Sequence, residues 1–193
     1  MNAEKYYNLG SEKYLSNQYA EAIEYYDKAI ELENDFELAI VEKAACKAAL
    51  KDYTGALADY KMALSINPNN ATTYINAGMM LNLIDSNNKD SSFIDKALEL
   101  DNKNSLAHYM KGLILANDNM HKQAIEYFTN AIELDSTDSD SYCIRGCCYK
   151  DLKIYDKALA DFKKADEIAP NNYDDIEKDI KECEEALRGV VTQ

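Results

Sequence analysis

The sequence of 193 residues contains no tryptophan, only two prolines and six glycines, and no long apolar run. A helix that crosses a membrane needs about 20 consecutive apolar residues, and no segment approaches that length. The first residues, MNAEKYYNLG, lack the basic start and the apolar core of a secretory signal. We therefore expect a cytoplasmic protein without membrane segments.

Basic residues are scarce as well: 21 Lys and Arg stand against 35 Asp and Glu, which gives a net charge of -14. The acidic excess runs through the chain without a basic stripe, so nucleic-acid phosphates and anionic membranes are repelled. We expect neither as a partner. The excess fits a solvated outer face or a dedicated site for a basic partner, and the first interpretation is favoured.

The five cysteines are an odd number without disulfide-like spacing, which fits a reducing compartment. Cys143 and Cys147 are four residues apart on one helical face, with Cys148 beside them. A zinc site needs further ligands, and these are missing from the surrounding sequence. The sequence therefore predicts no metal and no cofactor.

Alanine recurs five times at an interval of 34 residues, which is typical of a stacked repeat protein. Four glycines share one slot of this register, and both prolines share another at the end of a repeat, where a residue without a backbone N–H ends a helix. We predict a single solenoid over residues 1–193 that ends in a capping helix over residues 173–188. Its repeats are 3–36, 37–70, 71–104, 105–138 and 139–172.

Each repeat shows two amphipathic stripes of helical spacing, and small residues allow the two helices to approach closely. Large residues fill one slot of the second helix: Tyr26, Tyr60, Ile94, Phe128 and Phe162. The third repeat is degenerate, because Asn87 and Asp90 replace an aromatic and a small residue. Residues 85–92 are predicted to form a longer loop, with a second helix that begins near Ser91 or Ser92. This departure indicates a hinge or simple drift in a turn, and drift is favoured.

The stretch NLGSEKYLSNQYAEAIEYYDKAIELEND and its echo KDYTGALADYKMALSINPNN resemble the tetratricopeptide repeat (TPR) family. The likeness covers residues 3 to about 172 in five copies that keep one register. It implies an all-α, right-handed superhelix of helix pairs. It also implies a concave groove, lined by the first helix of each repeat, that binds peptides or partner proteins.

The resemblance assigns a mostly apolar set of side chains to this groove. They are Tyr7, Leu38, Val41, Ala45, Ile75, Met79, Leu106, Tyr109 and Leu113. We predict that they hold an extended or helical partner segment through apolar anchors. The alternative is that these side chains only pack against neighbouring helices. Charge reversal at Ile75 separates the two, because it disrupts folding only if the residue is core.

Some TPR proteins grip the acidic tails of chaperones with a clamp of lysine, asparagine and arginine. The matching positions here hold Tyr7, Ser11, Glu42, Thr72 and Asn76. Of these only Asn76 suits such a clamp. We therefore expect no carboxylate clamp and no affinity for chaperone tails.

No catalytic constellation emerges from the sequence. His108 and His121 occupy slots that other repeats fill with Tyr or Ile, and the glycines serve helix packing, not phosphate binding. We predict a non-enzymatic scaffold or adaptor for partner proteins. Two alternatives remain: a structural protein that self-assembles, as a weak homodimer through its N-terminal helix, and a chaperone-like protein that shields an apolar segment.

Overall fold

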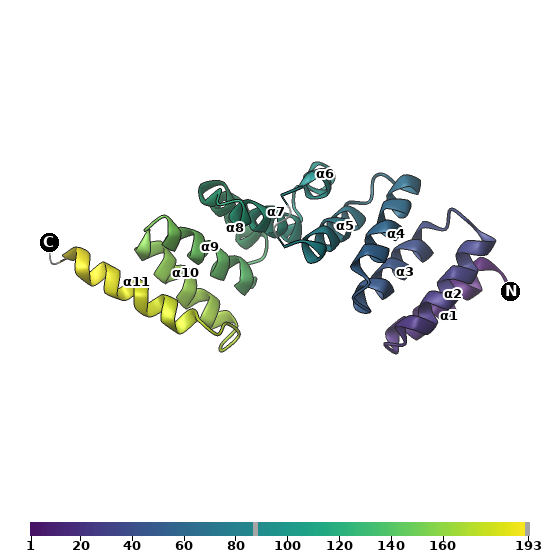
Figure 1. Cartoon of the computed structure of the whole chain (residues 1–193), viewed down its shortest axis with the longest axis horizontal. Coiled ribbons are helices and arrows are strands. Elements are labelled where there is room, and N and C mark those ends of the chain that lie inside the picture. Colours follow the sequence, from purple (N-terminus) through teal and green to yellow (C-terminus); the bar gives the residue numbers. More distant parts are fainter. Residues whose placement is uncertain (87–88, 192–193) are drawn as a thin grey trace. The chain divides into compact units, whose positions relative to one another are not determined.

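The computed structural model describes residues 1–86 and 89–191, and within them every regular element is an α-helix (Figure 1). The first six helices are α1 (Ala3–Leu15), α2 (Tyr19–Leu32), α3 (Glu37–Ala49), α4 (Tyr53–Ile66), α5 (Ala71–Ile84) and α6 (Ser92–Leu100). The others are α7 (Ser105–Asn117), α8 (His121–Leu134), α9 (Ser139–Asp151), α10 (Tyr155–Ile168) and α11 (Ile176–Val191). The predicted all-α class is confirmed. None of the described helices is both long and apolar enough to span a membrane.

The helices group into two compact units. The N-terminal unit contains α1 to α6, and the C-terminal unit contains α7 to α11 together with residues 89–91. Inside each unit a helix packs against the next one in the chain, as expected for helices joined by short turns.

The first helix of every repeat begins at the residue where the 34-residue register begins. In four of the five, an Asn or Asp side chain accepts a hydrogen bond from the backbone N–H three residues later and so caps the helix. The capping residues are Asn2, Asn70, Asn104 and Asp138. Short polar side chains thus place the start of each repeat.

The core of a repeat forms where a small residue of its first helix faces a large residue of its second helix. A Cβ atom on Gly10 would lie 2.6 Å from the ring of Tyr26, and one on Gly112 would lie 2.9 Å from the ring of Phe128. The large-slot side chains are buried in all five repeats. The glycines therefore make room for a large side chain of the paired second helix, which explains why both slots keep one register.

The turn between the two helices of a repeat has a left-handed residue at a fixed slot. Asn17, Lys51, Asn119 and Lys153 have φ values of 57°, 65°, 59° and 61°. The third repeat has Asp85 in this slot, and its φ is -142°. Without the left-handed residue the chain leaves α5 extended, and the second helix begins only at Ser92, as predicted.

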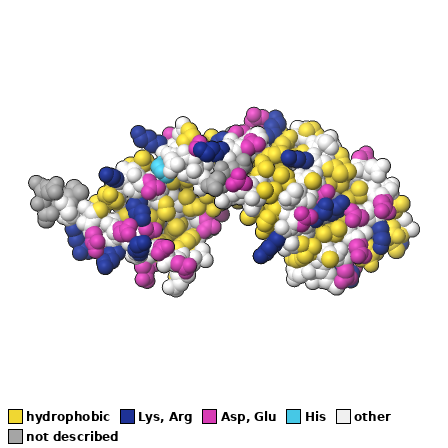
Figure 2. All heavy atoms as spheres, viewed as in Figure 1, with side chains coloured by type: hydrophobic (Ala, Val, Ile, Leu, Met, Phe, Trp, Pro, Cys, Tyr) yellow, Lys and Arg dark blue, Asp and Glu magenta, His cyan; other side chains and the backbone are white. Residues whose placement is uncertain are grey.

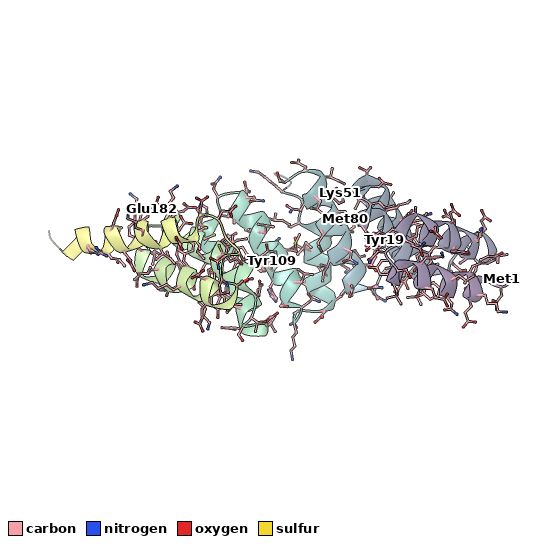
Figure 3. All side chains as sticks on the ribbon, turned by 90° about the horizontal axis from the view of Figure 1, so that it is seen from below. Met1, Tyr19, Lys51, Met80, Tyr109 and Glu182 are labelled. Carbon is pink, nitrogen blue, oxygen red and sulfur yellow. The ribbon has the colours of Figure 1, made fainter. Side chains whose placement is uncertain are left out.

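Replacing Lys51 with glycine is expected to raise the free energy of unfolding by about 1 kcal/mol, because a Cβ atom is strained at positive φ. Lys51 lies exposed between α3 and α4 (Figure 3). The matched control is Leu50→Gly, since Leu50 precedes it with a φ of -81°. Urea unfolding followed by circular dichroism should show the control destabilised. Equal destabilisation of both variants would contradict this account.

The second and fifth repeats have a basic residue on the first helix and an aspartate on the second helix at equivalent positions. In the fifth, Arg145 donates two hydrogen bonds to the carboxylate of Asp161, at 2.8 and 2.7 Å, and a third to Thr129 at 3.0 Å. In the second, Lys43 Nζ lies 2.8 Å from Asp27 and 3.8 Å from Asp59. Lys43 and Arg145 lie three repeats apart at the same position of the repeat, so each unit has its own salt bridge of the same kind.

The last helix, α11, covers the end of the fifth repeat. Ile176 and Cys183 are buried on its inner face, and Lys163 of α10 pairs with Glu184 at 2.9 Å. The sequence predicted a cap from residue 173, whereas the helix begins at Ile176. The difference arises because Tyr173 precedes the helix and hydrogen-bonds through its hydroxyl with Ser139 and Asp140 of α9.

Candidate protein-binding surfaces

The predicted groove residues of the N-terminal unit lie on its first helices, α1, α3 and α5. We call the side chains of Tyr7, Leu38, Val41, Ala45 and Met79 the N-terminal first-helix face. Leu38 is 52% exposed, and the other four are half-buried. Figure 2 shows hydrophobic side chains gathered over part of this unit. The face therefore offers apolar surface to a ligand.

Ile75 does not belong to this face. Its side chain is only 2% exposed, whereas residues in the equivalent slot, such as Tyr7 and Val41, are half-buried. For this residue the packing alternative holds, and the assignment as a surface anchor is corrected. Charge reversal at Ile75 is therefore a test of folding and cannot report on binding.

The C-terminal unit presents Leu106, Tyr109 and Leu113 on α7, and we call these the C-terminal first-helix face. Leu106 is 43% exposed, and the other two are half-buried. Tyr109 is labelled in Figure 3. Leu106 and Tyr109 also line a pocket of about 240 Å³ together with Ser105, Asp135, Asp138 and Asp140. Burial, with a smaller contribution from Asp140 and Asp138, raises the pKa of Tyr109 to about 12.

Glu42 adds a charged side chain to the N-terminal first-helix face. It lies on α3 beside Val41 and is half-buried, and burial raises the pKa of its carboxyl group. Among the residues that the structure describes, no hydrogen-bond donor or cation pairs with it. The neighbouring Lys43 and Lys47 pair instead with Asp27 of α2 and Asp59 of α4.

The sequence interpretation considered Glu42 only as a mismatch to a carboxylate clamp and assigned it no role of its own. Two further leucines present apolar side chains at the C-terminal ends of first helices: Leu15 is 81% exposed and Leu83 is 50% exposed. They share one slot of the repeat, which holds Ala49, Asn117 and Asp151 in the other three repeats.

The histidines and cysteines are buried or half-buried in the described part of the chain. His108 Nε2 lies 2.9 Å from the carbonyl oxygen of Asn102, and His121 Nε2 lies 3.6 Å from Asp151. Burial raises the pKa of Cys148 to about 12, and Cys143 and Cys147 are half-buried. Within residues 1–86 and 89–191, no three His, Cys, Asp or Glu side chains are placed to hold a metal ion.

Family models described as tetratricopeptide repeat match residues 3–36, 106–138 and 139–172, which together make up about half of the chain. No curated protein matches the chain significantly.

Several solved structures are similar. YrrB, described as a TPR protein with an unusual peptide-binding site, is 24% identical with a TM-score of 0.74, over 89% of this chain and 88% of its own. PilW, described as a type IV pilus biogenesis factor, is 21% identical with a TM-score of 0.80, over 96% of this chain and 86% of its own. MamA from Desulfovibrio magneticus RS-1 is 19% identical with a TM-score of 0.80, over 88% of this chain and 96% of its own. At these identities the likeness shows the fold alone.

Proposed function

Because the chain belongs to the tetratricopeptide repeat family, whose members generally bind other proteins, we propose that it is a non-enzymatic adaptor. Each of its two first-helix faces binds apolar side chains of a partner. One observation carries this proposal: Leu38 and Leu106, two repeats apart in one slot, expose a large apolar side chain on the first helix of their repeats. An exposed apolar side chain beside half-buried apolar neighbours, as each unit has on its own first-helix face, is typical of a protein-binding surface.

Replacing Leu38 and Leu106 together with glutamate is expected to abolish capture of the partner without unfolding the protein, because both side chains are exposed. Two equally exposed leucines on second helices provide the control. Leu32 is 57% exposed and Leu134 is 43% exposed, against 52% for Leu38 and 43% for Leu106. The pair Leu32→Glu and Leu134→Glu carries the same charge change and should retain the partner.

The measurement is affinity capture from the source cell's lysate with quantitative mass spectrometry, after circular dichroism has shown that both double variants keep their helix content. A protein retained by the wild type and the control but lost by the Leu38 and Leu106 variant identifies the partner. Equal sets from all three chains would refute the proposal.

The N-terminal tyrosines do not favour the alternative of self-assembly. Tyr7 packs against Tyr26 and Phe36, with ring centroids 5.8 and 5.2 Å apart, and Tyr14 packs against Tyr19 at 5.6 Å. These contacts hold much of each ring inside the N-terminal unit, and the part of Tyr7 that remains exposed belongs to the proposed binding face. A chaperone-like role remains a variant of the adaptor proposal, because it uses the same apolar faces.

A further inference from the structure

The half-buried carboxylate of Glu42 has no partner among the described residues. Taking a carboxylate partly out of water without a compensating cation is unfavourable, which is why its pKa is raised. The raised pKa means that Glu42 contributes most to stability at pH values below its ordinary pKa. This contribution is lost as pH rises through the folded pKa, so the ionised group opposes folding at neutral pH. A partner that supplies a cation would reverse this effect.

The surroundings of Glu42 suit a long basic side chain. Leu38, Val41 and Ala45 lie on the same helix within one turn of it and offer apolar surface to an aliphatic stem. After burial itself, the Glu42 carboxylate is the next contributor to the raised pKa of Tyr14 and of Tyr60. The negative charge therefore lies close to the ring of Tyr14, which is half-buried and attracts a cation as well.

We propose that the N-terminal first-helix face binds a partner segment in which a lysine or arginine stands among apolar residues and pairs with Glu42. The inference rests on the proposed adaptor function and adds the charge of the ligand to it. Two observations carry it: the carboxylate lacks a partner within the described residues, and it lies on an otherwise apolar face. The net charge of -14 also speeds the encounter with a basic segment.

The test is selection from a displayed library of random short peptides against the full chain and three variants. Glu42→Gln removes the charge and Glu42→Lys reverses it, whereas Glu31→Gln makes the same change at an exposed position on α2. The wild type and Glu31→Gln should enrich apolar peptides that contain lysine or arginine. Glu42→Gln should lose the basic preference, and Glu42→Lys should enrich acidic peptides instead.

The outcomes separate this inference from the adaptor function on which it rests. Apolar peptides without basic residues, or a basic preference that survives Glu42→Gln, would overturn the inference and leave the adaptor function standing. No enrichment from any chain would overturn both. A concentration-dependent dimer that dissociates in Glu42→Lys would mean that a second copy occupies the face, which also contradicts the inference.

A selected peptide then allows calorimetry. Glu42→Gln should bind it about tenfold more weakly, since a hydrogen bond to a charged group contributes about that much. Glu31→Gln should match the wild type, and the affinity of the wild type should fall as salt is added. If Glu42→Gln also unfolded at lower urea than the wild type, Glu42 would be a structural residue, and the inference would fail.

Discussion

Replacing Arg145 with leucine is expected to lower the free energy of unfolding of the C-terminal unit by about 3 to 5 kcal/mol. Asp161 is only 6% exposed, and its carboxylate accepts two hydrogen bonds from the Arg145 guanidinium. Leucine fills much of the same space but leaves that carboxylate charged and buried without a cation. Removing one partner of such a pair is far more destabilising than removing both.

The control is the double variant Arg145→Leu with Asp161→Tyr. It copies the first repeat, where Leu9 and Tyr25 occupy these slots. Urea unfolding followed by circular dichroism should show that the double variant recovers most of the lost stability. Arg145→Lys should fall between wild type and Arg145→Leu, because lysine keeps the charge but cannot donate two parallel hydrogen bonds. Equal losses in the single and double variants would show that the salt bridge is not the cause.

The second large effect is alkaline unfolding of the N-terminal unit between pH 10 and 12. Burial raises the pKa of both Tyr26 and Tyr60 to about 12, from an ordinary value of 10.0. In that interval the unfolded chain has lost both phenol protons and the folded chain has kept them. The contribution of these two tyrosines to the free energy of unfolding is therefore fully present below pH 10. It falls by about 3 kcal/mol per tyrosine by pH 12.

A pH titration that records the absorbance of tyrosine phenolate together with circular dichroism checks this result. All 15 tyrosines contribute to this absorbance, so the part that belongs to Tyr60 is taken as the difference between the wild type and Tyr60→Phe. That part should appear at the pH at which helix content is lost, because buried Tyr60 ionises only when the fold opens. The variant Tyr60→Phe should unfold at higher pH, since one of the two coupled ionisations is removed. Ionisation of Tyr60 with unchanged helix content would contradict the prediction.

The fold was predictable because each repeat satisfies the same packing problem. Gly10 and Tyr26 keep their spacing in later repeats, since a ring and a missing side chain must meet where two helices cross. The late start of α6 was predictable for a related reason, because the degenerate stretch offers Ser92 as the next polar residue before an apolar stripe. The left-handed slot was not predicted, since lysine and asparagine occupy it instead of glycine.

The candidate site was less predictable because a shift of one residue along a helix turns the side chain by about 100° around the helix axis and so changes the face on which it lies. Ile75 and Val41 occupy the same slot, yet only Ile75 is buried, and the neighbours that bury a side chain are not encoded in its own helix. Glu42 is adjacent to Lys43 in sequence, but adjacent helical residues point about 100° apart, so the pair cannot meet. Which acid a lysine neutralises follows from the packing of several helices.

The contacts between successive repeats also encode their order. Asp27, Lys61 and Thr129 occupy the same position of their repeats, and each contacts the repeat that follows it. Asp27 pairs with Lys43, and Thr129 accepts a hydrogen bond from Arg145. Lys61 lies over the ring of Phe93. A chimera that joined the fifth repeat directly to the second would bring Lys61 next to Arg145 and create repulsion. Shuffling by recombination is therefore restricted by charge, although every repeat shares one length and one core.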